Sequence, residues 1–99
     1  MTDQEFAALA ERTLARIEDA VDALDEDIDA QRAGNVLTFE LESGEKIVVN
    51  TQQPMHEIWL AARSGGFHYK WDGAAWRDTR SSETLFEALS RVLGASIAP

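Results

Sequence analysis

Apolar side chains recur every three or four positions along the first quarter of the chain. Placed at 100° per residue, they fall on one face of a helix, and charged residues occupy much of the opposite face. The apolar face comprises Phe6, Leu9, Ala10, Thr13, Leu14, Ile17, Ala20, Val21 and Leu24. Asp3 and Glu5 stand near the start, where carboxylates interact favourably with the helix dipole. The pattern predicts an amphipathic helix of about 20 residues.

From residue 35 the pattern changes to an alternation of apolar and polar residues, which predicts β-strands. Short turns that contain Gly separate several of these strands, and connections this short join antiparallel neighbours. Phe67, Tyr69 and Trp71 alternate with His68 and Lys70, so we assign the three aromatic residues to the core. Five strands are expected, over residues 36–42, 46–50, 56–62, 67–71 and 75–78.

A second amphipathic helix is predicted near the end of the chain. Ser81 or Ser82 can cap its start, and Gly94 can end it. The two helices bracket the strands in the order α-β-β-β-β-β-α, and the most economical packing places both helices on one face of the sheet. We therefore expect a single domain over residues 1–99, an α+β two-layer sandwich with an antiparallel sheet of five or six strands. The apolar face of the second helix comprises Leu85, Phe86, Leu89, Val92 and Leu93.

The composition excludes several classes of function. The chain has no Cys, which removes disulfides, thiolate metal sites and cysteine nucleophiles. The first residues, MTDQEF, lack the basic and apolar regions of a signal peptide, and no apolar run approaches the roughly 20 residues of a membrane span. The net charge of −9 disfavours binding to nucleic acids or anionic membranes. We expect a soluble, cytoplasmic protein.

The negative charge is concentrated in the first third of the chain. Residues 1–30 hold ten acidic and two basic residues, whereas residues 31–99 hold eight and seven. Within EDAVDALDEDID, residues 18–29, seven of the twelve residues are carboxylates and none is Lys or Arg. Glu18 and Asp22 form a like-charge pair one helical turn apart, near the helix end where the dipole disfavours anions. Local stability therefore does not explain the arrangement.

These acidic residues are candidates for metal binding. Carboxylate oxygens suit hard or borderline cations such as Fe²⁺, Fe³⁺, Mg²⁺, Ca²⁺ and Mn²⁺, and binding at an exposed site is weak, poorly selective and salt-dependent. An EF-hand is rejected, because Ala30 stands at the required Gly position and Val36 at the required Glu position. A docking surface for a basic partner and a simple solvated face are the alternatives. The candidate ligands are Glu18, Asp19, Asp22, Asp25, Asp27 and Asp29.

The middle of the chain resembles the frataxin family. Residues 50–69, NTQQPMHEIWLAARSGGFHY, are similar to its most recognisable segment, an Asn-x-Gln-x-Pro run followed by Trp-Leu-Ala and a turn that contains Gly. Residues 72–89, DGAAWRDTRSSETLFEAL, are similar to the last strand and helix of the family. The likeness covers almost the whole chain and is closest to the short bacterial members called CyaY. The matching positions are Asn50, Gln52, Pro54, Trp59, Leu60 and Gly65.

The resemblance implies weak binding of Fe²⁺ or Fe³⁺ along an acidic ridge made by the first helix and the first strand. It also implies a regulatory role in iron–sulfur cluster assembly, through contact with the cysteine desulfurase and the scaffold protein. The alternatives are an acidic interaction module with incidental metal binding, and an iron oxidase or iron store. A monomer is expected, with oligomerisation in iron as the alternative. The acidic residues expected to face a partner are Glu11, Glu18, Asp22 and Asp25.

A second candidate site surrounds Trp59. In HEIWLAA, residues 56–62, two large aliphatic residues share one strand face, and Trp59 shares the other with Glu57. If the aliphatic pair faces the helices, Trp59 faces water beside Glu57 and can anchor a partner; burial by neighbouring side chains is the alternative. In the family, this Trp belongs to the partner-facing surface of the sheet. Asn50 and Gln52 either share that surface or order the loop that follows them.

No catalytic group of residues is apparent. His56 and His68 are isolated in the sequence, and we interpret both as ordinary surface histidines, with a role as an extra iron ligand as the alternative. The Gly-rich turn at 64–66 lacks the following helix of a phosphate-binding loop. Exposed carboxylates lack the burial that tunes pKa values for acid–base chemistry. We therefore expect no enzymatic activity.

Overall fold

The predicted N-terminal helix forms over Asp3–Asp22 (α1) and begins with a capping box. The Thr2 hydroxyl accepts a hydrogen bond from the Glu5 N–H at 3.0 Å, and the Glu5 carboxylate accepts one from the Thr2 N–H at 2.8 Å. These hydrogen bonds lower the pKa of Glu5. The apolar face predicted from the sequence is the buried face, with Phe6 and Ile17 at 1% and 0% exposure. The helix and its orientation are therefore confirmed.

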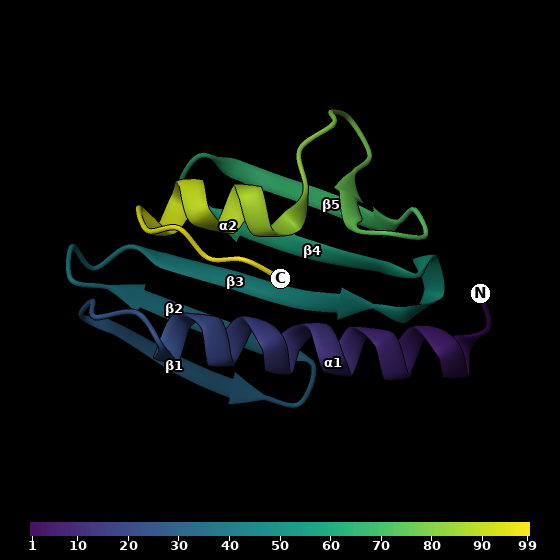
Figure 1. Ribbon diagram of the computed structural model, residues 1–99, viewed down its shortest axis with the longest axis horizontal. Coiled ribbons are helices and arrows are strands. Elements are labelled where there is room, and N and C mark those ends of the chain that lie inside the picture. Colours follow the sequence, from purple (N-terminus) through teal and green to yellow (C-terminus); the bar gives the residue numbers. More distant parts are fainter.

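The computed structural model describes residues 1–99 and shows both helices on one face of a six-stranded sheet (Figure 1). Each strand pairs antiparallel with its neighbour in the sequence, so the sheet is a simple meander. The α+β two-layer sandwich is confirmed. The other elements are β1 (Ile28–Ala33), β2 (Val36–Leu41), β3 (Lys46–Gln52), a 3₁₀ turn η1 (Gln53–Met55), β4 (Glu57–Ala62), β5 (Gly65–Trp71), β6 (Trp76–Asp78) and α2 (Leu85–Leu93).

The edge strand β1 is the strand that the alternation pattern missed. It pairs with β2 from Ile28 opposite Leu41 to Ala33 opposite Val36. Its face toward the helices carries Ile28, a small Ala and an Arg, so the alternation of large apolar and polar residues that identifies a strand is absent. The acidic stretch therefore ends in a strand, not in a loop, and this difference determines how its carboxylates are arranged.

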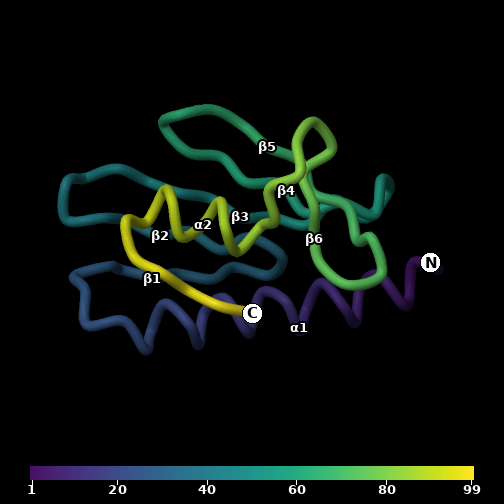
Figure 2. Tube along the Cα trace, turned by 45° about the horizontal axis from the view of Figure 1, so that its top comes forward, coloured from purple at the N-terminus to yellow at the C-terminus, as the bar shows by residue number.

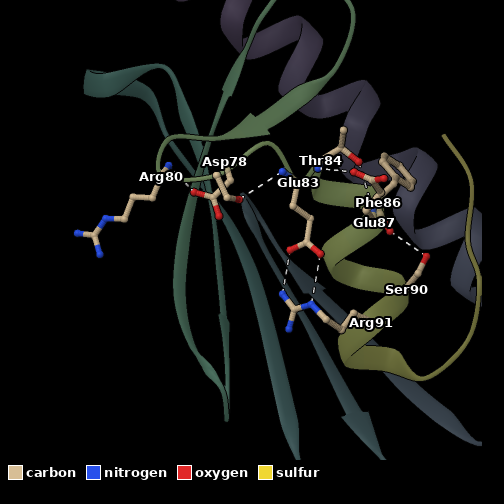
Figure 3. Close-up of polar contacts among 9 residues, drawn as sticks. Asp78, Arg80, Glu83, Thr84, Phe86, Glu87, Ser90 and Arg91 are labelled. Carbon is tan, nitrogen blue, oxygen red and sulfur yellow. Dashed lines mark hydrogen bonds and ion pairs between the residues drawn. The ribbon is translucent and has the colours of Figure 1, made fainter.

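Helix α2 begins later than expected, with Thr84 as its N-cap and not Ser81 or Ser82. An antiparallel bridge to Arg77 holds Thr84 itself in an extended conformation, so the helix starts only after this residue. Thr84 and Glu87 then form a second capping box, with hydrogen bonds of 2.8 and 3.2 Å (Figure 3). The predicted end at Gly94 is confirmed by its positive φ of 71°.

The core lies between the sheet and the two helices. Tyr69 is fully buried, as expected, and Trp76 of β6 is also buried at 3% exposure. Phe67 and Trp71 lie on the same strand face but are only half-buried and pack against the margin of the core, so their assignment to the core was right only in part. After α2 the chain returns between the two helices toward α1, and this returning segment buries Ile97 (Figure 2). Neither helix is long and apolar enough to cross a membrane.

Candidate functional site

The acidic ridge follows the C-terminal end of α1 into the start of β1. We define it as Glu18, Asp19, Asp22, Asp25, Glu26, Asp27 and Asp29. Leu24 and Ile28 pack against the core on either side of the connection, and the carboxylates between them are left in solvent. All ridge residues except the half-buried Glu18 are exposed. The acidic residues that the sequence places close together therefore also lie close together in the fold, along the end of α1 and the start of β1.

Arg32 forms ion pairs with two of the four carboxylates predicted to face a partner and leaves the other two unpaired. It lies on the helix-facing side of β1, where its guanidinium forms ion pairs with Glu11 and with Glu18, the latter at 2.9 Å. The hydrogen bonds that Arg32 donates to the carboxylates of Glu18 and Glu11 raise the pKa of Arg32. Because the alternation pattern did not predict β1, this pairing of Arg32 with the helix was not expected. Two of the candidate residues are therefore engaged within the protein.

The remaining predicted ligands carry no ion pair. The salt bridges of the ridge are those from Arg32, which leaves Asp19, Asp22, Asp25 and Asp27 free and exposed. Asp29 is free as well, but it lies opposite Glu40 in the β1–β2 ladder and points away from the side of β1 that carries Arg32. No group of three or more Asp, Glu or His side chains in the protein is arranged around a common metal position. The ridge is a row of separate carboxylates.

The electrostatics of the ridge are unfavourable for the helix that carries it. The last turn of α1 has no basic residue, while Asp19 and Asp22 lie near its C-terminal end. The helix dipole and the neighbouring carboxylates both oppose negative charge there. A bound cation or a basic surface would relieve this repulsion. Exposed oxygen donors suit hard or borderline metal ions that keep most of their water ligands.

The second candidate site lies on the sheet face opposite the helices. The register of β3 and β4 places Asn50 directly beside Trp59, and Gln52 beside Glu57. The two candidate amides and the candidate Trp are therefore neighbours on one surface, and all three are half-buried. Ile58 and Leu60, at 0% and 1% exposure, point to the helices, so the strand orientation is as predicted.

Trp59 is half-buried and partly covered by neighbouring side chains, which is the alternative that the sequence left open. Its ring stacks on His68 with a centroid separation of 4.2 Å and an interplanar angle of 5°. Its indole N–H donates a 2.8 Å hydrogen bond to Glu57. Glu57, expected to be solvated beside it, is buried at 6% exposure. The expectation for Glu57 was wrong, because strand alternation gives the direction of a side chain but not which neighbours cover it.

The other histidine joins distant parts of the chain. His56 follows η1 with a positive φ of 51°, lies 2.7 Å from the Asp3 carboxylate and stacks on Phe6 at 5.1 Å. His56 is only partly exposed, so it is a structural contact between η1 and α1 as well as a surface residue. Neither histidine lies on the ridge.

Comparison with known proteins places this architecture in a family. The family described as a frataxin-like domain matches residues 1–98. A relative from Cupriavidus pinatubonensis, named iron-sulfur cluster assembly protein CyaY, is 53% identical over 94 residues, covering 91% of this chain and 85% of the relative. The solved frataxin of Psychromonas ingrahamii is 33% identical, with a TM-score of 0.85 over 98% of this chain and 96% of that one.

A more distant likeness is to a trimeric frataxin from the yeast Saccharomyces cerevisiae. It is 26% identical, with a TM-score of 0.68, and the match covers 88% of this chain and 74% of the yeast chain. The two-helix sandwich and the ordered meander are thus shared with proteins from bacteria and yeast. With a family match over nearly its whole length and half of its residues identical to a bacterial CyaY, the chain belongs to the frataxin family.

Proposed function

We propose that this protein is a non-enzymatic, iron-binding accessory protein of iron–sulfur cluster assembly that acts in the cytoplasm. Its bacterial relatives carry the name iron-sulfur cluster assembly protein CyaY, which supports the pathway. The observation that carries the iron role is the row of free, exposed carboxylates at the end of α1, placed where the helix dipole opposes them. Because this arrangement destabilises the helix, binding of a cation that offsets the negative charge is a physical reason for it.

Iron is the cargo in this proposal and not a resident cofactor. Asp19, Asp22, Asp25 and Asp27 supply single exposed oxygen donors, and Fe²⁺ or Fe³⁺ keeps water at its other positions. Binding is therefore weak, and it competes with salt and with other hard cations. Glu18 contributes less than the sequence suggested, because Arg32 already occupies its carboxylate.

The same ridge docks the cysteine desulfurase, and the Trp59 surface contacts the scaffold or the assembled complex. Docking a basic protein surface is favoured by one specific observation, which is that the ridge carboxylates are spread along a border and not gathered at a point. Metal and partner then compete for these carboxylates, or iron bridges them, and either case lets iron modulate the desulfurase–scaffold complex. The protein itself is expected to be a monomer.

The first test is an NMR titration of the labelled apo-protein with Fe²⁺ under anaerobic conditions, with Ca²⁺ in parallel. We expect shifts or line broadening confined to residues 11–29 and the adjoining part of β1. The Asp22→Asn variant should reduce them, whereas the Glu42→Gln variant, which changes an exposed acid outside the ridge, should not. If saturating iron leaves the ridge unperturbed, the iron role fails and the ridge is a docking surface alone. Fe²⁺ oxidation above the buffer rate would contradict the non-enzymatic assignment.

A further inference from the structure

Glu57 is the one carboxylate that the sheet buries. It lies at the start of the central strand β4, on the face that the helices leave open, and only 6% of the residue is exposed. Removing a charged carboxylate from water is costly unless it is paired and hydrogen-bonded. Hydrophobic residues of similar volume often replace buried ion pairs without loss of stability. Stability is therefore a poor reason for an acid at this position, and its contacts point to a different role.

The contacts of Glu57 converge on Trp59. One carboxylate oxygen accepts the indole N–H at 2.8 Å and lies 3.5 Å from Nδ1 of His68. The other oxygen lies 3.7 Å from the Lys70 ammonium. His68 in turn covers one face of the Trp59 ring, parallel and 4.2 Å away. Glu57 and His68, from two neighbouring strands, thus fix the ring at its N–H and at one face.

We propose that Glu57 is a positioning residue for the docking surface at Trp59. Its carboxylate holds the indole N–H, so the ring is ordered before a partner arrives and the partner meets the free ring surface, not the N–H. This inference rests on the proposed function, in which the desulfurase–scaffold complex contacts this face. His68 completes the support, and Lys70 balances the buried charge.

The expected size of the effect follows from the entropy of ordering. Immobilising a flexible side chain on binding costs about 0.5–1.5 kcal/mol, which corresponds to roughly two- to tenfold in affinity. A protein in which Trp59 is already fixed avoids that cost. Loss of the Glu57 acceptor should therefore weaken binding by about two- to tenfold, while the contact surface itself is unchanged.

The test compares two substitutions at one position. Glu57→Met removes the acceptor at similar volume, whereas Glu57→Gln keeps an amide oxygen that can accept the indole N–H. Binding to the purified cysteine desulfurase–scaffold complex is measured by calorimetry, with Trp59→Ala as the reference for the surface. We expect E57M to bind about two- to tenfold more weakly and E57Q to bind within about twofold of the wild type. The Trp59 indole resonance should move in E57M, and the Trp76 indole resonance should stay in place.

Each outcome decides the proposal. If W59A weakens binding but E57M does not, the positioning role is overturned and the docking surface stands. If W59A has no effect, the docking surface fails and the positioning role fails with it. Equal losses in E57M and E57Q, with the indole bond kept in E57Q, would assign the effect to charge and overturn positioning.

A measurement on the unmodified protein covers the case in which E57M does not fold. The Trp59 indole N–H should exchange with solvent more slowly than that of the half-buried Trp71, whose indole has no hydrogen-bond partner. Equal exchange rates for the two indoles would show that Glu57 does not hold the ring in solution, and the proposal would be rejected.

Discussion

At the scale of single residues, a threonine on the apolar face of α1 connects this helix to β6. Thr13 is buried at 8% exposure, and its hydroxyl donates to the Leu9 carbonyl at 2.8 Å. The same oxygen accepts a hydrogen bond from the Trp76 indole N–H at 2.9 Å, so the hydroxyl is both donor and acceptor. The sequence placed Thr13 correctly on the buried face, but nothing in the pattern indicated its partner 63 positions away.

Thr13→Val should lower the free energy of unfolding by about 1–3 kcal/mol, because it leaves the buried Trp76 N–H without an acceptor. The shape of the side chain is nearly unchanged, so lost packing contributes little. Urea denaturation followed by far-ultraviolet circular dichroism measures the change. Thr13→Ser keeps the hydroxyl and is the matched control. An equal loss in both variants would mean that the methyl group, and not the hydrogen bond, is what the site requires.

At the scale of elements, the two ends of α1 differ in how well their side chains suit the helix dipole. Its N-terminus has a complete capping box, while its last turn carries acids and no base. The tertiary contacts of the apolar face hold the helix in place despite this. Arg32 from β1 forms ion pairs with Glu11 and Glu18, so the sheet offsets part of the negative charge on this side of the helix.

Asp22→Asn should therefore raise the free energy of unfolding by about 0.3–1 kcal/mol, because it removes an anion from the unfavourable end of the helix dipole. Glu18→Gln, one turn earlier, should lower it by about 0.2–1 kcal/mol, because it breaks the ion pair with Arg32. Chemical denaturation at low ionic strength resolves both changes, and added salt should shrink them. A loss of stability in both variants would show that the ridge carboxylates support the helix.

At the scale of the whole molecule, the two candidate surfaces differ in their physics. The ridge is a charged border whose carboxylates are free except for Glu18, and the Trp59 surface is an ordered ring on the open sheet face. Long-range charge accelerates encounter, whereas a buried aromatic contact sets how long a complex lasts. One partner can therefore be attracted by the first surface and held by the second.

The double variant Asp22→Asn with Asp25→Asn should slow association with the desulfurase complex and weaken its salt dependence. Trp59→Ala should instead speed dissociation and leave the salt dependence of association unchanged. Stopped-flow or surface-based kinetics at two or more salt concentrations separates the two. If both variants change only the dissociation rate, the ridge does not steer the encounter.

Periodicity predicted most of the fold because most elements bury a regular set of large apolar residues. The stripe that includes Phe6 and Ile17 and the alternation around Ile58 and Leu60 leave little choice of structure. The edge strand β1 was not predicted, because Ala30 and Arg32 occupy positions where a central strand would carry large aliphatic residues.

The candidate sites were predictable in position but not in their internal contacts. The ridge is visible as a run of acids, yet its split by Arg32 depends on the strand that the pattern missed. The direction of Trp59 follows from alternation, whereas the burial of Glu57 depends on His68 and Lys70 from the next strand. Contacts between residues that are distant in the sequence are set by register and packing, which local pattern does not specify.

The pairing of α1 with the far end of the chain bears on how the protein is made. The strands pair in the order in which they leave the ribosome, so hairpins can form one after another. The helix emerges first, yet Phe6 packs against His56 and Trp76, which are synthesised much later. At about 5–20 residues per second, that interval lasts roughly 4–14 s. During it the apolar stripe of the nascent helix is uncovered and open to chaperones, while the net negative charge of the helix opposes association of unfinished chains.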